Sequence, residues 1–206
     1  RDRSESGEED VAMEGTLWAA SPDSPDIRPA DPSANYTLID TVDALRDVMA
    51  SIRDKGQVCL DVETTGLDVM RADLCGISLA TEPGSGFYIP IRSPEPANHL
   101  DQATVVREVR EVLEDEGIVK IAHNAKFDLK MLRRVGIRVG GPVKDTMVAS
   151  YVSNTSRSRH SMDVLALGLL ELQCIPISAL IGSGASQRSF ETVSYTHLRA
   201  HETHEN

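Results

Sequence analysis

The sequence is poor in cysteine and in positive charge, and it has no long hydrophobic run. Its three cysteines, Cys59, Cys75 and Cys174, stand apart among apolar neighbours without C-x-x-C spacing, which is typical of reduced core thiols in a cytosolic protein. No apolar run approaches the roughly 18 residues of a membrane-spanning helix, and no signal peptide is visible. We therefore expect a globular cytoplasmic protein with no membrane segment.

Acidic residues outnumber basic ones by 32 to 21, which gives a formal net charge of −11. This deficit of positive charge argues against a broad surface for binding duplex nucleic acid. It still allows a local site that binds the end of a strand through metal ions, because such ions neutralise the carboxylates that hold them.

The first 35 residues differ in composition from the rest of the chain. They hold 9 acidic and 3 basic side chains, are rich in Ser and Pro, and lack periodicity, so we interpret residues 1–35 as an acidic disordered linker. The 206 residues suffice for one domain plus extensions. Because the chain begins at Arg1 rather than Met, we expect it to be a fragment.

Hydrophobic periodicity after residue 35 predicts an α/β domain. It predicts strands at 36–39, 58–65, 74–81, 87–91 and 118–122, and helices at 42–55, 102–114, 126–134, 145–152 and 162–172. Turn-forming residues at 82–86 predict a hairpin, so the strands between 58 and 91 are expected to form an antiparallel meander. The strand that follows the crossover helix is expected to be parallel to its neighbour. The prediction is a mixed five-stranded sheet flanked by helices.

The stretch at residues 58–67 carries two acids at the end of a buried strand. Side chains alternate along a strand, so Asp61 and Glu63 share a face, and the strand stops at Gly66. Burying two carboxylates that repel each other is unfavourable, and a pair of oxygen-preferring ions such as Mg²⁺ or Mn²⁺ would compensate for it. The alternative is that both acids are simply solvated at an exposed strand end.

A third acid, Asp128, is expected in the first turns of the helix at 126–134, behind Asn124 as its N-cap. A carboxylate there is favoured by the helix dipole. The position lies just past a strand end, where ligand sites gather in open α/β sheets.

Five segments together resemble one known family, the 3′-to-5′ proofreading exonuclease domain of bacterial DNA polymerase I. The segments are Leu60-Asp61-Val62-Glu63-Thr64-Thr65-Gly66-Leu67, Phe87-Tyr88-Ile89-Pro90-Ile91, His123-Asn124-Ala125-Lys126-Phe127-Asp128, Asp145-Thr146-Met147 and Arg159-His160-Ser161-Met162-Asp163. The resemblance covers residues 36–193 and implies a ribonuclease H-like fold. It also implies a four-carboxylate site with two divalent metal ions, and a polymerase domain further along the parent chain.

Within this resemblance, Asp61 would bridge the two metals, Glu63 would hold the first, and Asp128 would hold the second through water. That arrangement suits hydrolysis of a phosphodiester at the 3′ end of single-stranded DNA. The resemblance also assigns contacts with the last nucleotides to Leu67, Asn124, Lys126, Phe127 and Arg159. Such stacking and backbone contacts read no sequence.

The residues assigned to nucleic-acid contact also have purely structural explanations. Leu67 and Phe127 could be ordinary core residues, and Lys126 and Arg159 could be solvated surface. We interpret Asp145 and Asp163 as structural residues that cap or pair. We interpret a further set of cations as a solvated helix face: Lys130, Arg133, Arg134 and Arg138.

The sequence departs from the family at its end. The family supplies a fourth carboxylate and a tyrosine from a Tyr-x-x-x-Asp helix, but the matching positions here are His201 and Glu205. Residues 194–203 look like translated sequencing adapter, so we interpret residues 194–206 as a non-native tail. We therefore expect weak or absent nuclease activity. A catalytically inert polymerase module and a ribonuclease D-like RNA exonuclease remain as alternative functions.

Overall fold

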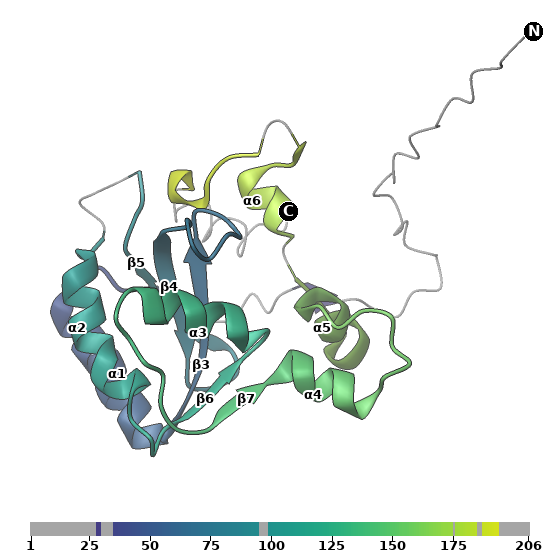
Figure 1. The fold of residues 1–206 in the computed structure, drawn as a ribbon, viewed down its shortest axis with the longest axis horizontal. Coiled ribbons are helices and arrows are strands. Elements are labelled where there is room, and N and C mark those ends of the chain that lie inside the picture. Colours follow the sequence, from purple (N-terminus) through teal and green to yellow (C-terminus); the bar gives the residue numbers. More distant parts are fainter. Residues whose placement is uncertain (1–27, 30–34, 95–98, 175, 185–186, 194–206) are drawn as a thin grey trace, which may run out of the picture.

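The computed structural model describes residues 28–29, 35–94, 99–174, 176–184 and 187–193. The strands are β1 (Arg28–Pro29), β2 (Asn35–Leu38), β3 (Gln57–Thr64), β4 (Leu74–Ala80), β5 (Ser85–Pro90), β6 (Val119–Ala122), β7 (Val143–Asp145) and β8 (Leu172–Gln173). The helices are α1 (Val42–Lys55), α2 (Gln102–Leu113), α3 (Ala125–Arg134), α4 (Thr146–Ser153), α5 (Met162–Leu170), α6 (Ile177–Ile181) and the 3-10 helix η3 (Phe190–Thr192). Figure 1 shows their arrangement.

Two of the proposed segments fall largely outside these ranges. The proposed tail at 194–206, with His201 and Glu205, lies wholly outside the described residues. Of the proposed linker at 1–35, only Arg28, Pro29 and Asn35 are described. Arg28 and Pro29 form β1, which pairs in parallel with β8.

The described residues form a main sheet of six strands in the order β2-β5-β4-β3-β6-β7. The pairs β3–β4 and β4–β5 are antiparallel, which confirms the predicted meander. The pair β3–β6 is parallel, as expected after a crossover helix. The predicted number of five strands is wrong, because β7 adds a sixth at the edge beside β6. With three residues, β7 is too short to show an alternating pattern.

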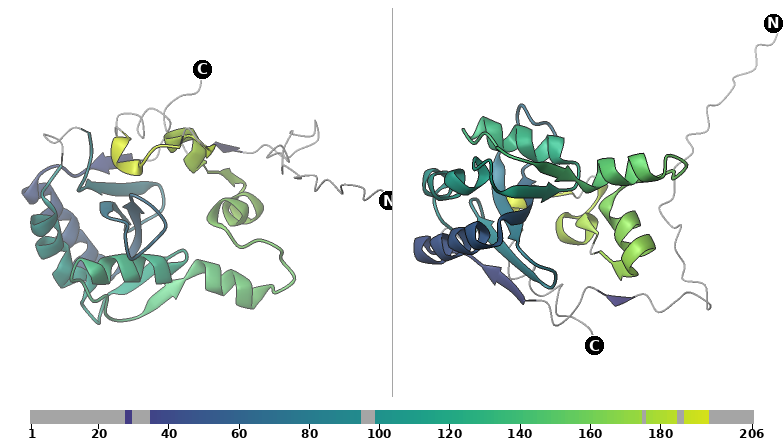
Figure 2. Two further views of the ribbon diagram at one scale, coloured as in Figure 1. Left: turned by 45° about the horizontal axis from the view of Figure 1, so that its top comes forward. Right: turned by 90° about the horizontal axis from the view of Figure 1, so that it is seen from below.

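The first helix follows directly from its sequence. Thr41 accepts a hydrogen bond from the backbone N–H of Ala44, and Gly56 ends the helix in the left-handed region at φ 66°. The apolar stripe of α1, which faces the main core, consists of Leu45, Val48, Met49 and Ile52. Figures 1 and 2 show α1 and α2 side by side along the sheet.

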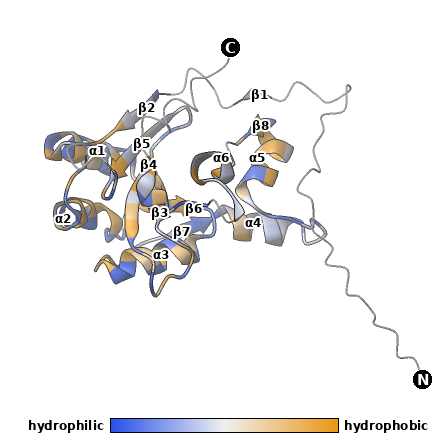
Figure 3. Ribbon diagram, turned by 90° about the horizontal axis from the view of Figure 1, so that it is seen from above, coloured by the Kyte–Doolittle hydropathy of each residue, from blue (hydrophilic) through white to orange (hydrophobic). Residues whose placement is uncertain are grey.

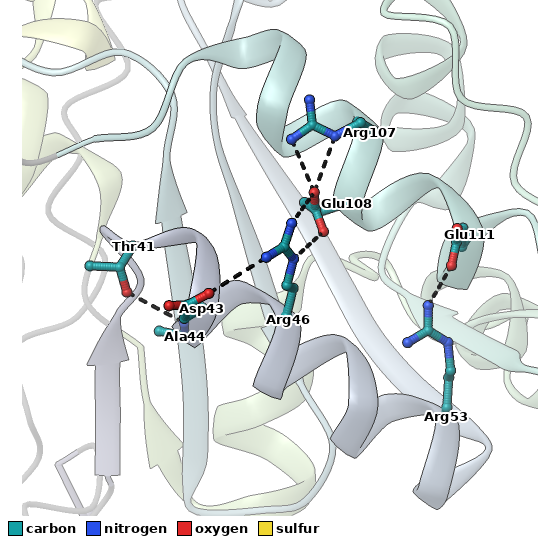
Figure 4. Close-up of polar contacts among 8 residues, drawn as sticks. All are labelled: Thr41, Asp43, Ala44, Arg46, Arg53, Arg107, Glu108 and Glu111. Carbon is teal, nitrogen blue, oxygen red and sulfur yellow. Dashed lines mark hydrogen bonds and ion pairs between the residues drawn. The ribbon is translucent and has the colours of Figure 1, made fainter.

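Ion pairs connect the outer faces of α1 and α2 (Figure 4). Arg46 Nε donates to Glu108 Oε2 at 3.0 Å, and Arg53 Nη2 donates to Glu111 Oε2 at 2.8 Å. Arg107 also donates to Glu108. Their arginines and Glu111 are exposed, so solvent screens these pairs and they add little to stability. They set the alignment of two helices whose packing depends on the apolar stripes.

The segment after β7 leaves the main sheet (Figures 1 and 2). No residue of α4, which is described throughout, is buried, and within the fully described α5 only Leu165 is. Hydrophobic residues colour much of α5 in Figure 3. The exposed apolar side chains of the two helices are Val148, Tyr151, Val152, Met162, Leu169 and Leu170. A separate small cluster packs α6 and η3 against β4 through Cys75, Ile181 and Phe190.

None of the helices in the described part of the chain has the length and apolarity to span a membrane.

Asp145 joins the sheet edge to two helices. Its carboxylate accepts the N–H groups of Asn124 at 3.2 Å and Ala125 at 2.9 Å, at the start of α3. It also accepts those of Met147 at 2.9 Å and Val148 at 3.1 Å, at the start of α4. Burial opposes its ionisation, but these four donors together hold the pKa of Asp145 below its ordinary value. The structural interpretation of Asp145 is confirmed.

Asn124 has a different role from the one predicted. It occupies the N-cap position of α3, but its side chain makes no capping hydrogen bond and its φ is 65°. Asn tolerates the left-handed region better than most residues. The capping acceptor comes instead from Asp145, which is distant in sequence and therefore invisible to a local capping rule.

We expect Asp145→Ala to lower the free energy of unfolding by about 2 to 4 kcal/mol, because it removes the acceptor for two helix N-termini at once. Urea unfolding followed by circular dichroism measures this change. The matched control is Asp54→Ala, an exposed acid near the end of α1, which should stay within about 0.5 kcal/mol of wild type. Equal stability of the two variants would contradict the double-cap interpretation.

Candidate active site

The alternation predicted for β3 is present in the structure. Val58, Leu60 and Val62 are buried in the main core. Asp61 and Glu63 point to the other face, and both are only partly exposed. The alternative of two freely solvated acids therefore does not describe this strand end.

The third acid reaches the same place from α3. Asp128 is 2% exposed, and its Oδ1 accepts the backbone N–H of Val62 at 3.3 Å. Its side chain also hydrogen-bonds with that of Asp61. The structure thus brings Asp61, Glu63 and Asp128 together, although 66 residues separate Val62 from Asp128 in sequence.

Burial and mutual repulsion raise the pKa values of these three acids. Burial, followed by the charges of Asp61 and Asp128, raises the pKa of Glu63 to about 7. Burial, followed by the charge of Asp61, raises the pKa of Asp128 to about 7. Burial also raises the pKa of Asp61, against the hydrogen bonds from Val62 and Asp128 and the charge of His123.

The donor set suits a hard divalent cation, because it consists of carboxylate oxygens whose charge is uncompensated. Among the described residues, no Lys or Arg forms an ion pair with any of the three acids. Within the same described ranges, no three or more His, Cys, Asp or Glu side chains are already arranged to hold a metal ion. The acids are gathered but not arranged as ligands, so cation binding would require their side chains to be deprotonated and to adjust.

The residues assigned to nucleic-acid contact differ in how far their side chains are exposed to solvent. Leu67 follows β3 and is 90% exposed, which excludes the ordinary-core alternative for it. Phe127 is half-buried against the main core. Lys126 is exposed and Asn124 half-buried, both at the start of α3. Arg159 is exposed in the connection between α4 and α5, where its charge acts on Asp163.

Two further residues near the acids were not singled out from the sequence. His123 Nδ1 hydrogen-bonds Thr146 Oγ1 at 2.9 Å, while its Nε2 is buried without a partner among the described residues. Its charge acts on Asp61. The sequence feature that could have identified His123 is its position, because it is the first residue of the His123-Asn124 motif.

The other residue is Tyr88 of β5, whose ring passes over Gly76. A Cβ on Gly76 would lie 2.3 Å from the Tyr88 hydroxyl oxygen, so only glycine leaves room for the ring. Gly76 is the β4 partner of Glu63. Burial, followed by the charge of Glu63, raises the pKa of Tyr88. The alternation of side chains along one strand does not predict that the Tyr88 side chain extends diagonally over the neighbouring strand β4.

The raised pKa of Glu63 makes the metal-free domain sensitive to pH. A carboxyl group with a higher pKa in the folded state stabilises the protein below its unfolded pKa, and the stability is lost as pH rises from 4.5 toward about 7. We expect wild type in EDTA to lose about 2 kcal/mol more stability than Glu63→Gln between about pH 5 and about pH 8. Urea unfolding at both pH values, with the exposed Glu116→Gln as control, measures this, and parallel losses in all three proteins would refute it.

A protein-family model described as "3'-5' exonuclease", from the DNA polymerase A family, matches residues 36–193. The DNA polymerase I of Pseudomonas aeruginosa is 33% identical over 144 residues, which covers 66% of this chain and 15% of that protein. The DNA polymerase I of Chloroflexus aurantiacus is 34% identical over 170 residues, which covers 80% of this chain and 18% of that protein. The chain thus spans less than a fifth of these relatives.

Solved structures share the fold at low identity. Brucella melitensis NrnC with bound Mg²⁺ has a TM-score of 0.53 and 24% identity, over 82% of this chain and 79% of that one. Trypanosoma brucei RNase D in complex with RNA U12 has a TM-score of 0.64 and 14% identity, over 82% of this chain and 58% of that one. These similarities confirm the predicted ribonuclease H-like fold. Because the family model matches residues 36–193, the chain belongs to the 3′-5′ exonuclease domain family of DNA polymerase I.

Proposed function

We propose that this chain is the proofreading module of a longer bacterial DNA polymerase I and that its acids hydrolyse the 3′-terminal phosphodiester of DNA with two divalent metal ions, Mg²⁺ or Mn²⁺. The single observation that supports this most strongly is the convergence of Asp61, Glu63 and Asp128, without an ion-paired Lys or Arg among the described residues. A buried cluster of like charges persists in a fold when a ligand neutralises it.

Each acid has a proposed role. Asp61 would be a ligand shared by both ions, Glu63 would hold the first, and Asp128 would hold the second through water. The ions, when bound, supply a hydroxide from water and stabilise the leaving 3′ oxygen. Asp128 keeps its orientation through the Val62 N–H, so the position that it offers is fixed by the backbone of β3.

The strand end is held by side chains that do not read sequence. Leu67 wedges against the terminal base, and Phe127 contacts the next nucleotide from the start of α3. Asn124, Lys126 and Arg159 contact the sugar-phosphate backbone. Because these contacts are available for every base, the site would remove any mismatched 3′ nucleotide.

The metal part of this proposal is tested by titrating the chain with Mn²⁺ in a calorimeter. Wild type should bind the ion, and Asp61→Ala should weaken binding by at least about 10-fold because it removes the proposed bridging ligand. Asp54→Ala, on the far end of α1, should bind like wild type. An absence of binding to wild type would overturn the metal proposal and favour the inert-module alternative.

The nuclease part is tested with labelled single-stranded DNA in Mg²⁺ or Mn²⁺. This chain should cleave weakly or not at all, because His201 and Glu205 stand where the family has its Tyr and fourth Asp. A chain extended beyond Val193 through a native Tyr-x-x-x-Asp helix should cleave at least about 10-fold faster, since it restores a metal ligand. Equal, robust cleavage by both chains would refute the missing-ligand explanation.

The ribonuclease D-like alternative shares the acids, and Trypanosoma brucei RNase D shares the fold at 14% identity. The continuation Thr64-Thr65-Gly66-Leu67 and the Tyr88-Ile89-Pro90 strand favour the polymerase branch. In the extended chain, faster removal of a 3′ nucleotide from RNA than from DNA would replace the polymerase proposal with this alternative.

The proposed setting is a parent polymerase in the bacterial cytoplasm, associated with the nucleoid, whose polymerase domain follows in the same chain. The exposed apolar residues of α4 and α5 support a neighbour on that side of the domain. The relatives' length supports it too, since this chain spans 15% and 18% of two of them. Exposed apolar surface of this kind is typical of a domain interface.

A further inference from the structure

The loop that joins β3 to β4, residues 66–73, is held in one shape by its own hydrogen bonds. At its base, the backbone N–H of Thr65 donates to Asp73 O at 3.0 Å, and the N–H of Asp73 donates to Thr65 Oγ1 at 2.9 Å. At its tip, Asp68 Oδ1 accepts the N–H of Met70 at 3.0 Å. Asp68 O accepts the N–H groups of Arg71 and Ala72 at 2.9 and 2.7 Å. The loop is therefore a preformed turn rather than a slack connection.

A second element fixes the loop from outside. Arg134, in the last turn of α3, donates from Nη1 to Val69 O at 2.6 Å and also to Ala72 O. The interpretation of Arg134 as part of a solvated helix face is therefore wrong, because its guanidinium group satisfies two loop carbonyls. The same helix carries Asp128 in its first turn. One helix thus positions both an acid of the site and the loop beside that site.

The loop turns two apolar residues inward and two outward. Ala72 is 5% exposed, and Val69 is half-buried against the main core. Leu67 is 90% exposed and Met70 is 78% exposed. Apolar side chains held in water by an ordered loop are a feature of binding surfaces, since an ordered loop with no ligand gains nothing from them.

We propose that Met70 contacts a nucleobase beside Leu67, so that the loop forms an apolar platform for the last two bases of a single-stranded 3′ end, and that Arg134 is the positioning residue of this platform. This inference rests on the proposed function. The loop starts three residues after Glu63, so whatever contacts it lies next to the acids. Met70 suits this role because a flexible, polarisable thioether adapts to any aromatic face.

The charges of the loop favour a base rather than a phosphate as its ligand. Arg71 is paired with Asp68 at 3.6 Å, and Asp73 is paired with Arg92 at 3.2 Å. The cations available for phosphates, Lys126 and Arg159, belong to other segments. The loop therefore presents an apolar surface with balanced charge, which selects unstacked bases and reads no sequence.

The test uses single-stranded oligonucleotides with 2-aminopurine at the last or the penultimate 3′ position, with Ca²⁺ as the divalent ion. Fluorescence titration gives the affinity and the environment of each base. We expect Met70→Ala to weaken binding by about 3- to 10-fold and to change the fluorescence at only one of the two positions. Met70→Leu, which keeps the apolar volume, should bind within about 2-fold of wild type.

Arg134→Ala should weaken 3′-end binding like Met70→Ala, and Arg134→Lys should restore part of it because an ammonium group also donates to carbonyls. The control is Arg133→Ala, which removes the same charge from an exposed neighbour in α3 and should change nothing. In Arg134→Ala, the amides of Met70, Arg71 and Ala72 should also exchange hydrogen faster. Mn²⁺ affinity should stay unchanged, which separates loop positioning from a general loss of the site.

The outcomes separate this inference from the proposed function. Wild-type binding that Met70→Ala leaves unchanged at both labelled positions would overturn the platform and leave the exonuclease proposal standing. An equal loss in Arg133→Ala and Arg134→Ala would overturn the positioning role, because it would show a simple charge effect. A wild-type chain that binds no oligonucleotide would overturn the proposed function and the platform together.

Discussion

The contact of Asp128 with β3 is the interaction on which the rest of the site depends. Asp128 accepts the Val62 N–H and hydrogen-bonds with Asp61, so a side chain from α3 is fixed to the strand that carries the other two acids. A carboxylate that is 2% exposed is unfavourable unless its charge is neutralised. Burial and the charges of the neighbouring acids therefore raise the pKa values of Asp128 and Glu63. Divalent cations would relieve the same repulsion, because they neutralise the carboxylates that hold them.

The surrounding fold keeps α3 in register with β3 at both of its ends. At its start, Asp145 on the edge strand β7 accepts the first N–H groups of α3. At its end, Arg134 holds the carbonyls of the loop that follows β3. Asp128 lies between these two attachments, and the main core lies beneath them through Met131 and Leu132. The helix is thereby a rigid connection between the sheet edge, the acids and the exposed Leu67.

Local patterns predicted much of this arrangement. The alternation in β3 correctly separated Asp61 and Glu63 from the core residues, and the capping rule correctly placed Thr41 and Gly56. Other features depended on partners far away in sequence. The capping role fell to Asp145 instead of Asn124, and β7 was missed because three residues show no period. Arg134 looked like surface because a guanidinium bound to carbonyls has the same sequence signature as a solvated one.

The sequence by itself determined which residues are apolar, which strand end carries two acids and which known domain the chain resembles, because these depend on order and spacing along the chain. Only the tertiary structure decided that Asp128 meets Asp61, that Tyr88 passes over Gly76 opposite Glu63, and that Arg134 closes the 66–73 loop. Each of these contacts joins segments through the packing of α3 or the pairing of strands. Packing and pairing are properties of the assembled fold, so no local pattern encodes the distances that they produce.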